Sequence, residues 1–122
     1  MKILIVDDSR TMRLILKRAL RRAGYGRHPT IEASDGREAL EVFESEAPGL
    51  ILSDWNMPVM DGLEFCKAIR DSGSRVPFGF VTSEHTPEMR DRAKEAGATF
   101  LINKPFTPDK LDQALCAARV TT

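Results

Sequence analysis

The chain has 122 residues, of which 42% are hydrophobic and 30% are charged, so we expect residues 1–122 to form a single domain with its own core. Its 18 basic and 18 acidic residues cancel, and no strong net field therefore favours a nucleic acid or a membrane surface as a direct partner. Because no run approaches the roughly 20 apolar residues that span a bilayer, we expect no membrane insertion and a cytoplasmic location.

Five short apolar runs recur along the chain, and each is followed by an amphipathic stretch with helical spacing. Strands are predicted at residues 2–6, 30–33, 50–54, 76–81 and 100–103. Helices are predicted from Ser9 to Gly24, from Asp35 to Pro48, at about 63–69, at 87–96, and after Thr107. Five strand–helix pairs in one short chain predict a parallel sheet with right-handed crossovers and helices on both of its faces.

The starts of four expected helices carry capping residues, which satisfy the free backbone N–H groups of a first turn. Ser9 can cap the first helix, and the acids at 35 and 38 suit a capping box before the second. The other two starts share one pattern, a threonine cap followed by a proline in the first turn: Thr86-Pro87 and Thr107-Pro108.

The helix expected at residues 87–96 has an unusually thin apolar stripe. Only Met89, Ala93 and Ala96 fall on its inner face. Because a helix with few apolar contacts opens easily, we expect this one to be lightly anchored and mobile.

The two cysteines, Cys66 and Cys116, lie in helical patterns and have no neighbouring partner. This usage is typical of buried free thiols in a reducing cytosol. A disulfide between them is the less favoured alternative.

Polar residues gather where the predicted strands end. The first strand runs into Asp7-Asp8, the third into Asp54, the fourth into Thr82-Ser83, and the fifth into Lys104. The second strand ends in nothing reactive. If that strand lies at an edge of the sheet, the other four are consecutive neighbours, and their polar ends converge on one crevice at the carboxyl edge.

These residue types suggest a specific chemistry. Three carboxylates brought together repel one another, so a cation must be present or their pKa values must rise. An all-oxygen set completed by water suits Mg²⁺. A carboxylate screened in this way can attack phosphorus, and Asp54 is the candidate nucleophile. Lys104 would stabilise charge on the phosphoryl oxygens, and the Thr82 hydroxyl could move to donate to one after transfer.

Each of these residues also has a simpler explanation when it is taken alone. Asp8 is more often a helix cap than a metal ligand, and Thr82 could cap the helix that follows. Asp54 could simply end a strand, and Lys104 could be an exposed residue before a proline. Their joint occurrence at four strand ends is much harder to explain by such separate roles.

In its order and spacing of Asp7-Asp8, Asp54, Thr82 and Lys104-Pro105, the sequence resembles a two-component response-regulator receiver domain over nearly its whole length. Among receivers it most resembles the stand-alone chemotaxis regulators, through Ser53–Pro58 and the Met60-Asp61-Gly62 segment. The resemblance implies a doubly wound, flavodoxin-like α/β fold with strand order 2-1-3-4-5.

The resemblance also implies a role for each site residue. Asp54 is the phospho-acceptor, and a histidine kinase is the phosphodonor. Mg²⁺ is bound by Asp8, Asp54 and the backbone carbonyl of Asn56, with Asp7 acting through water. Lys104 pairs with the phosphoryl group, and its peptide bond to Pro105 is expected to be cis. Two further side chains would influence how quickly the phosphate is lost: Asn56 and Glu84.

One position departs from the family pattern. Receivers usually carry tyrosine or phenylalanine three residues before the lysine, whereas this chain has Leu101 there and Phe100 one position earlier. Either Leu101 packs inward permanently, or the output runs through the backbone of the loop after the fourth strand and its helix. A downstream protein would bind the surface around residues 84–110.

The leading hypothesis is therefore a phosphorylation-controlled binding switch in chemotaxis-type signalling, and not an enzyme. A relay intermediate or phosphate sink is an alternative, as is a receiver taken from a longer regulator. A Mg²⁺-dependent phosphatase could also form an aspartyl phosphate, but it would need an acid two residues after its nucleophile. Ser9 and Asn56 stand at those positions, so the spacing fails.

Overall fold

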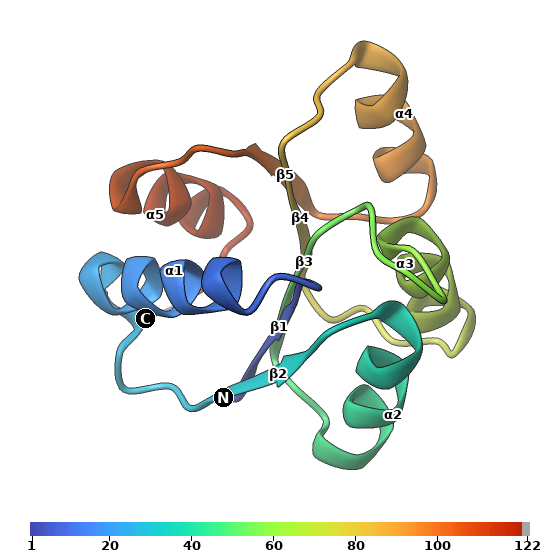
Figure 1. The fold of residues 1–122 in the computed structure, drawn as a ribbon, viewed down its shortest axis with the longest axis horizontal. Helices are drawn as coiled ribbons and strands as arrows, with labels where there is room; N and C mark the ends of the chain where they lie inside the picture. The colour runs from blue at the N-terminus through green and yellow to red at the C-terminus, as the bar shows by residue number, and fades with distance from the viewer. Residues whose placement is uncertain (121–122) are drawn as a thin grey trace.

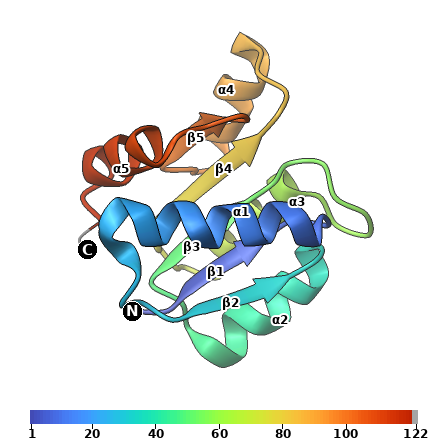
Figure 2. The ribbon, with the colours of Figure 1, turned by 60° about the vertical axis from the view of Figure 1, so that its left-hand side comes forward.

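The computed structural model describes residues 1–120, whose five strands form one central sheet (Figure 1). The strands are β1 (Ile3–Val6), β2 (Thr30–Ala33), β3 (Leu50–Ser53), β4 (Phe78–Thr82) and β5 (Phe100–Asn103). They are all parallel and lie in the order β2-β1-β3-β4-β5 (Figure 2). The expected α/β fold and strand order are thereby confirmed, while residues 121–122 of the predicted domain lie outside the described residues.

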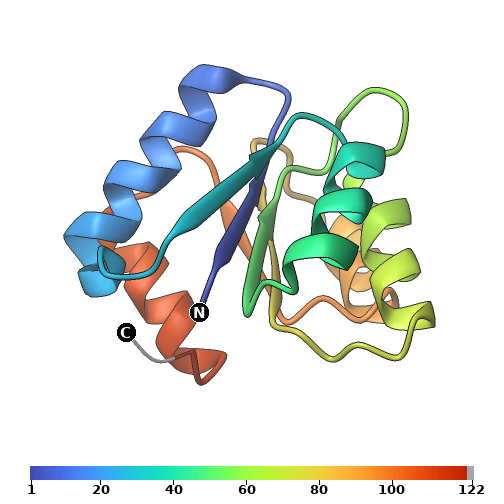
Figure 3. The same cartoon turned by 90° about the horizontal axis from the view of Figure 1, so that it is seen from below.

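Five α-helices cover both faces of the sheet. They are α1 (Arg10–Leu20), α2 (Gly36–Glu46), α3 (Gly62–Asp71), α4 (Pro87–Glu95) and α5 (Pro108–Ala117), and a wider turn, η1 (Arg21–Tyr25), continues α1. Figures 1 and 3 show α1 and α5 on one face of the sheet and α2, α3 and α4 on the other. This is the doubly wound arrangement that the alternating strand–helix pattern predicts.

The four predicted caps are present, because Ser9, Asp35, Thr86 and Thr107 each accept a hydrogen bond from the backbone N–H three residues on. The predicted capping box at Asp35 is only half formed, since the Glu38 carboxylate accepts a bond from the Ser34 hydroxyl instead of the Asp35 N–H. A complete capping box lies at the start of α3, between Asp61 and Glu64, and the sequence reasoning missed it.

The fourth strand begins later than predicted. The sequence predicted it at residues 76–81, whereas β4 covers Phe78–Thr82. Pro77 has no N–H to give to a ladder, and pairing with β3 starts at Phe78, opposite Ile51. The strand continues through Thr82 because the carbonyl of that residue accepts a hydrogen bond from the Lys104 N–H at 2.8 Å.

Two hydrophobic cores lie on opposite faces of the sheet, since successive side chains of a strand point to opposite sides. The α1/α5 core includes Ile3, Ile5 and Leu111, and the α2/α3/α4 core includes Leu4 and Phe80. Side chains of the central strand β3 are buried throughout.

Helix α4 is thinly attached, as its sequence predicted. Ala93 is its one fully buried residue, and Met89 is partly buried. The mobility of α4 stays a prediction. Between residues 1 and 120, no helix combines the length and the apolar content needed to cross a bilayer.

Both cysteines are free, as predicted. Cys66 is buried, and burial raises the pKa of its thiol to about 11. Cys116 is exposed, so the expectation that both thiols are buried was wrong for this residue. It follows the buried Leu115 on α5 and therefore faces away from the core.

Candidate functional site

The acids predicted to converge do so at the carboxyl ends of β1 and β3. One carboxylate oxygen from each of Asp7, Asp8 and Asp54 lies within 4.8 Å of the others. The two strands bring them together because Val6 pairs with Ser53, and the Asp54 N–H donates to the Val6 carbonyl at 2.8 Å. The three carboxylates form a candidate metal-binding cluster with one buried, one half-buried and one exposed member.

Lys104 reaches this cluster from the end of β5. Its Nζ lies 2.9 Å from Oδ2 of Asp7 and 3.5 Å from Oδ2 of Asp54. The expected cis bond between Lys104 and Pro105 is present. The single ammonium group therefore contacts two acids from different strands.

Negative charge exceeds positive charge within the cluster. Burial raises the pKa of Asp54, and the negative charge of Asp7 raises it further, while the Lys104 ammonium opposes both effects. A bound cation would offset the repulsion that remains between the carboxylates. This electrostatic imbalance supports the metal site inferred from the sequence.

The two oxygens of Asp54 have different surroundings. Oδ1 accepts a hydrogen bond from the Trp55 backbone N–H at 2.7 Å. Oδ2 faces Lys104 at the longer distance of 3.5 Å. The backbone thus orients the carboxylate through one oxygen and leaves the other turned to the lysine.

A tight loop supports the backbone of Asp54 from behind. The Gly62 N–H donates to the Trp55 carbonyl at 2.8 Å, and a Cβ at position 62 would lie 2.2 Å from the Asp54 carbonyl oxygen. Any residue other than glycine at position 62 would therefore force the backbone to move. Gly62 therefore lets α3 begin directly against the end of β3.

Thr82 is fully buried at the end of β4, beside the strand that carries Asp54. Its Oγ1 accepts a hydrogen bond from the Glu84 N–H at 3.3 Å. Asn56 and Glu84 are exposed on the flanking loops. The structure thus gathers Asp7, Asp8, Asp54 and Lys104 at one edge of the sheet and places Thr82 on the adjoining strand. Asn56 and Glu84 lie exposed beside them.

Leu101 lies on the α4 side of the sheet. It is half-buried, pairs in register with Phe80, and packs against the α2/α3/α4 core. Phe100 points to the opposite face, where its ring lies so close to Gly79 that a Cβ there would be 2.0 Å away. The neighbouring aromatic ring therefore cannot substitute for an aromatic side chain at position 101. Leu101 thus packs inward in this structure, and its permanent inward packing stays a prediction.

Three contacts at the site were not predicted. The Arg13 guanidinium donates through Nη1 to the Asp7 carbonyl at 2.6 Å. The centroids of the Trp55 and Phe80 rings lie 4.7 Å apart, and the Arg92 guanidinium carbon lies 5.8 Å from the centroid of the Trp55 ring. Arg13 follows the acid pair closely enough to be suspected from sequence. Arg92 is 37 positions from Trp55 in the chain numbering, and no motif links them.

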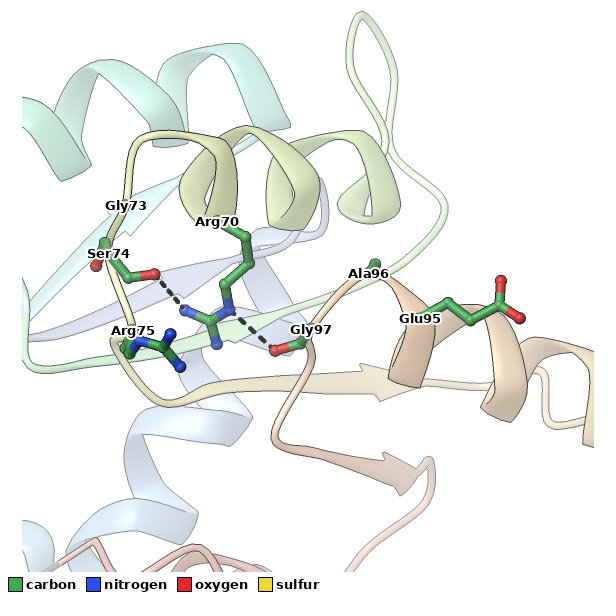
Figure 4. Close-up of a pocket in the computed structure, with 7 residues that line it drawn as sticks. All are labelled: Arg70, Gly73, Ser74, Arg75, Glu95, Ala96 and Gly97. Atoms are coloured by element: carbon green, nitrogen blue, oxygen red, sulfur yellow. Dashed lines mark hydrogen bonds between the residues drawn. The ribbon is translucent and has the colours of Figure 1, made fainter.

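A separate hollow lies at the amino ends of β4 and β5 (Figure 4). It measures about 490 Å³ and lies between the loop after α3 and the end of α4. Arg70 donates there to the carbonyls of Gly97, at 2.9 Å, and Ser74, at 3.2 Å. This arginine binds helix and loop ends, so the hollow has a structural explanation and the acid cluster remains the candidate site.

Comparisons of the sequence and of the structure with known proteins agree on one family. The response regulator receiver domain family matches residues 3–116. Chemotaxis protein CheY1 of Helicobacter pylori is 41% identical over 118 residues, which cover 94% of each chain. The structure of chemotaxis response regulator CheY4 of Vibrio cholerae superimposes with a TM-score of 0.84 at 39% identity, covering 96% of this chain and 97% of that one.

A longer relative shares the same domain. Response regulator MprA of Mycolicibacterium vanbaalenii is 38% identical over 111 residues, which are 90% of this chain and 46% of that protein. The match therefore extends to regulators in which this domain is one part. With the family match covering nearly the whole chain, the protein belongs to the response-regulator receiver domain family.

Proposed function

We propose that this receiver is a phosphorylation-controlled switch in which Asp54 accepts a phosphoryl group from a histidine kinase. The observation that carries the proposal is the placement of Asp54, whose Oδ2 faces Lys104 within a cluster of three acids. In the transfer, an Asp54 oxygen forms a bond to phosphorus. The bond from phosphorus to the kinase histidine nitrogen breaks, and that nitrogen keeps the electron pair.

The donor set fits Mg²⁺. All of its side-chain ligands are carboxylate oxygens, and the exposed Asp8 keeps the cluster open to water, which suits a hard cation that retains part of its hydration shell. Asp8 and Asp54 would hold the ion with the Asn56 carbonyl, and Asp7 would act through water. Bound Mg²⁺ would neutralise the carboxylates and stabilise charge on the phosphoryl oxygens.

The remaining residues would carry the signal. Lys104 would pair with the phosphoryl group, and the Thr82 hydroxyl would turn to donate to one of its oxygens. The surface around residues 84–110 would then change its preference for a downstream protein, with Asn56 and Glu84 influencing the lifetime of the phosphate. The likeness to CheY1 and CheY4 supports a role in chemotaxis-type signalling, as a cytoplasmic switch rather than an enzyme.

Intact-mass measurement tests the acceptor. The wild type incubated with acetyl phosphate and Mg²⁺ should gain one phosphate, and Asp54→Asn should gain none. Asp91→Asn is the matched control, since it makes the same chemical change on the exposed surface of α4. No adduct on the wild type, or an equal adduct on Asp54→Asn, would show that Asp54 is not the acceptor.

Tryptophan fluorescence tests the metal independently. Trp55 is the one tryptophan of the chain, and its backbone N–H donates to Oδ1 of Asp54. Adding Mg²⁺ at millimolar concentration should therefore change its emission, and EDTA should reverse the change. Replacing Asp8 by asparagine should weaken the response. A spectrum that Mg²⁺ leaves unchanged would contradict a metal site at this cluster.

A further inference from the structure

The loop between β4 and α4 is held to the sheet by few contacts. All side chains from Ser83 to Thr86 are exposed. The loop is tied locally by the Glu84 N–H, which donates to Thr82 Oγ1, and by the capping bond of Thr86. Apart from residues of the loop itself and of α4, one described residue forms a hydrogen bond with a side chain of this loop, namely Asn103 of β5.

His85 makes that connection. Its Nε2 lies 2.8 Å from Nη2 and 3.2 Å from Nε of Arg90, on α4. Its Nδ1 lies 2.9 Å from Nδ2 of the Asn103 side-chain amide. We call this set of contacts among His85, Arg90 and Asn103 the His85 clasp.

The partners define the state of the ring. A guanidinium can only donate, so Nε2 of His85 must accept from Arg90. A neutral ring then carries its proton on Nδ1 and donates it. The Asn103 amide must therefore be turned so that its oxygen, in place of Nδ2, faces the ring, since the two ends of an amide are assigned from such partners. Every group in the His85 clasp then has a matching partner.

The clasp acts at the same level of the sheet as Thr82. Asn103 is the register partner of Thr82 across β4 and β5, so the loop that begins after Thr82 is tied back to the neighbouring rung. Asn103 also precedes Lys104, whose side chain reaches the acid cluster. Adjacent residues of β5 thus contact the site and the loop.

We propose that His85 is a positioning residue that holds the loop after β4 in its unphosphorylated arrangement and so opposes the movement of Thr82. This inference rests on the proposed function, in which the Thr82 hydroxyl turns to the phosphoryl group. When it turns, Oγ1 leaves the Glu84 N–H, and the loop carrying Glu84 and His85 must shift. The His85 clasp resists that shift, so it lowers the affinity of the site for a phosphoryl group without touching it.

Beryllium fluoride is the probe, because with Mg²⁺ it can bind a carboxylate as a phosphoryl group does. We would titrate it against the wild type and variants, following Trp55 fluorescence. Since a single exposed hydrogen bond contributes modestly, His85→Ala and Asn103→Ala should each bind the probe roughly three- to tenfold more tightly. Both residues are exposed, so the variants are expected to fold.

His85→Gln is the matched control. Its carboxamide offers an acceptor oxygen to Arg90 and a donor nitrogen to Asn103, so its affinity for the probe should stay near that of the wild type. The affinity for Mg²⁺ alone should be the same in all four proteins, because the clasp lies outside the acid cluster.

Three results would overturn the inference while leaving the proposed function intact: both alanine variants bind the probe like the wild type, His85→Gln behaves like His85→Ala, or the Mg²⁺ affinity changes by the same factor. A wild type that responds to Mg²⁺ but not to the probe would instead overturn the proposed function, and this inference with it.

Discussion

Charged side chains are paired differently at the two ends of the sheet. At the amino end, the Arg70 guanidinium donates to the backbone carbonyls of Gly97 and Ser74. At the carboxyl end, three carboxylates lie close together, and the single ammonium of Lys104 contacts two of them. Although the chain has a formal net charge of zero, the charged group at the amino end has hydrogen-bond partners, whereas the carboxyl end carries more negative than positive charge. The carboxyl end is where a metal and a phosphoryl group would be bound.

Substituting one glycine at each end should separate site packing from ordinary loop strain. Gly62→Ala would place a Cβ 2.2 Å from the Asp54 carbonyl oxygen and 2.9 Å from the Phe80 ring. Because backbone must move to admit it, we expect a loss of about 2–3 kcal/mol in the free energy of unfolding. Slower phosphate incorporation should accompany it, since Asp54 is displaced.

Gly73→Ala is the control for that variant. No atom lies within 4 Å of a Cβ at position 73, but its φ of +91° is unfavourable for alanine, so a loss of about 1 kcal/mol is expected. Urea denaturation and intact-mass kinetics would measure both variants. Equal losses, or a phosphate defect in Gly73→Ala, would contradict the distinction between the two ends.

Removing the guanidinium at the amino end should affect stability alone. Arg70→Met loses the hydrogen bonds to Gly97 and Ser74, and we expect unfolding to become easier by about 1–2 kcal/mol. Incorporation of phosphate should be unchanged, because the acid cluster lies at the other end. Arg75→Met, at an exposed side chain lining the same hollow, should stay within about 0.5 kcal/mol of wild type. A defect in phosphate incorporation by folded Arg70→Met would show that the two ends are coupled.

Neutralising the acceptor should have the smallest effect, and it should stabilise the protein. The pKa of Asp54 is raised in the folded protein, chiefly by burial. Its contribution to stability is therefore complete when the group is protonated and is lost as the pH rises through the folded pKa. Without Mg²⁺ at pH 7.5 (roughly neutral), Asp54→Asn should unfold at a higher temperature than the wild type.

Lowering the pH through the raised pKa of Asp54 should narrow that difference, because the wild type then carries a neutral side chain as well. Adding Mg²⁺ should reverse the order, since an ion that binds only the folded wild type stabilises it. Differential scanning fluorimetry, with and without EDTA, would follow both changes. An Asp54→Asn variant that is less stable than wild type in EDTA would contradict the proposed electrostatic cost.

Most of the fold followed from apolar periodicity, because each buried strand and each amphipathic helix leaves a local pattern. The convergence of Asp7, Asp54 and Lys104 followed as well, since parallel strands place their carboxyl ends at one edge. Periodicity does not order strands within a sheet, and the order 2-1-3-4-5 rested on family resemblance. The late start of β4 was predictable in principle, because Pro77 cannot donate to a ladder.

Other features depend on side chains that meet only after folding. The Trp55–Arg92 contact, the Arg70 bond to Gly97 and the His85–Asn103 contact each join residues that are far apart in the sequence and share no motif. The exposure of Cys116 was missed for a related reason, since a helical pattern places a residue on a face only approximately. Sequence patterns do not encode these contacts locally.

The Phe100 ring over Gly79 has an evolutionary consequence. The Phe100 ring occupies the space that a side chain at position 79 would need. The two positions should therefore vary together among relatives, because a larger residue at 79 requires a smaller one at 100. The family's usual aromatic at position 101 would put a ring on the opposite face of the sheet. A chain that gained an aromatic at position 101 would still have the Phe100 ring against Gly79. A chain in which the ring moved from position 100 to position 101 would leave space beside residue 79, and a larger residue at 79 would then be favoured. Gly79 is therefore tied to the ring at position 100 and not to the side chain at position 101.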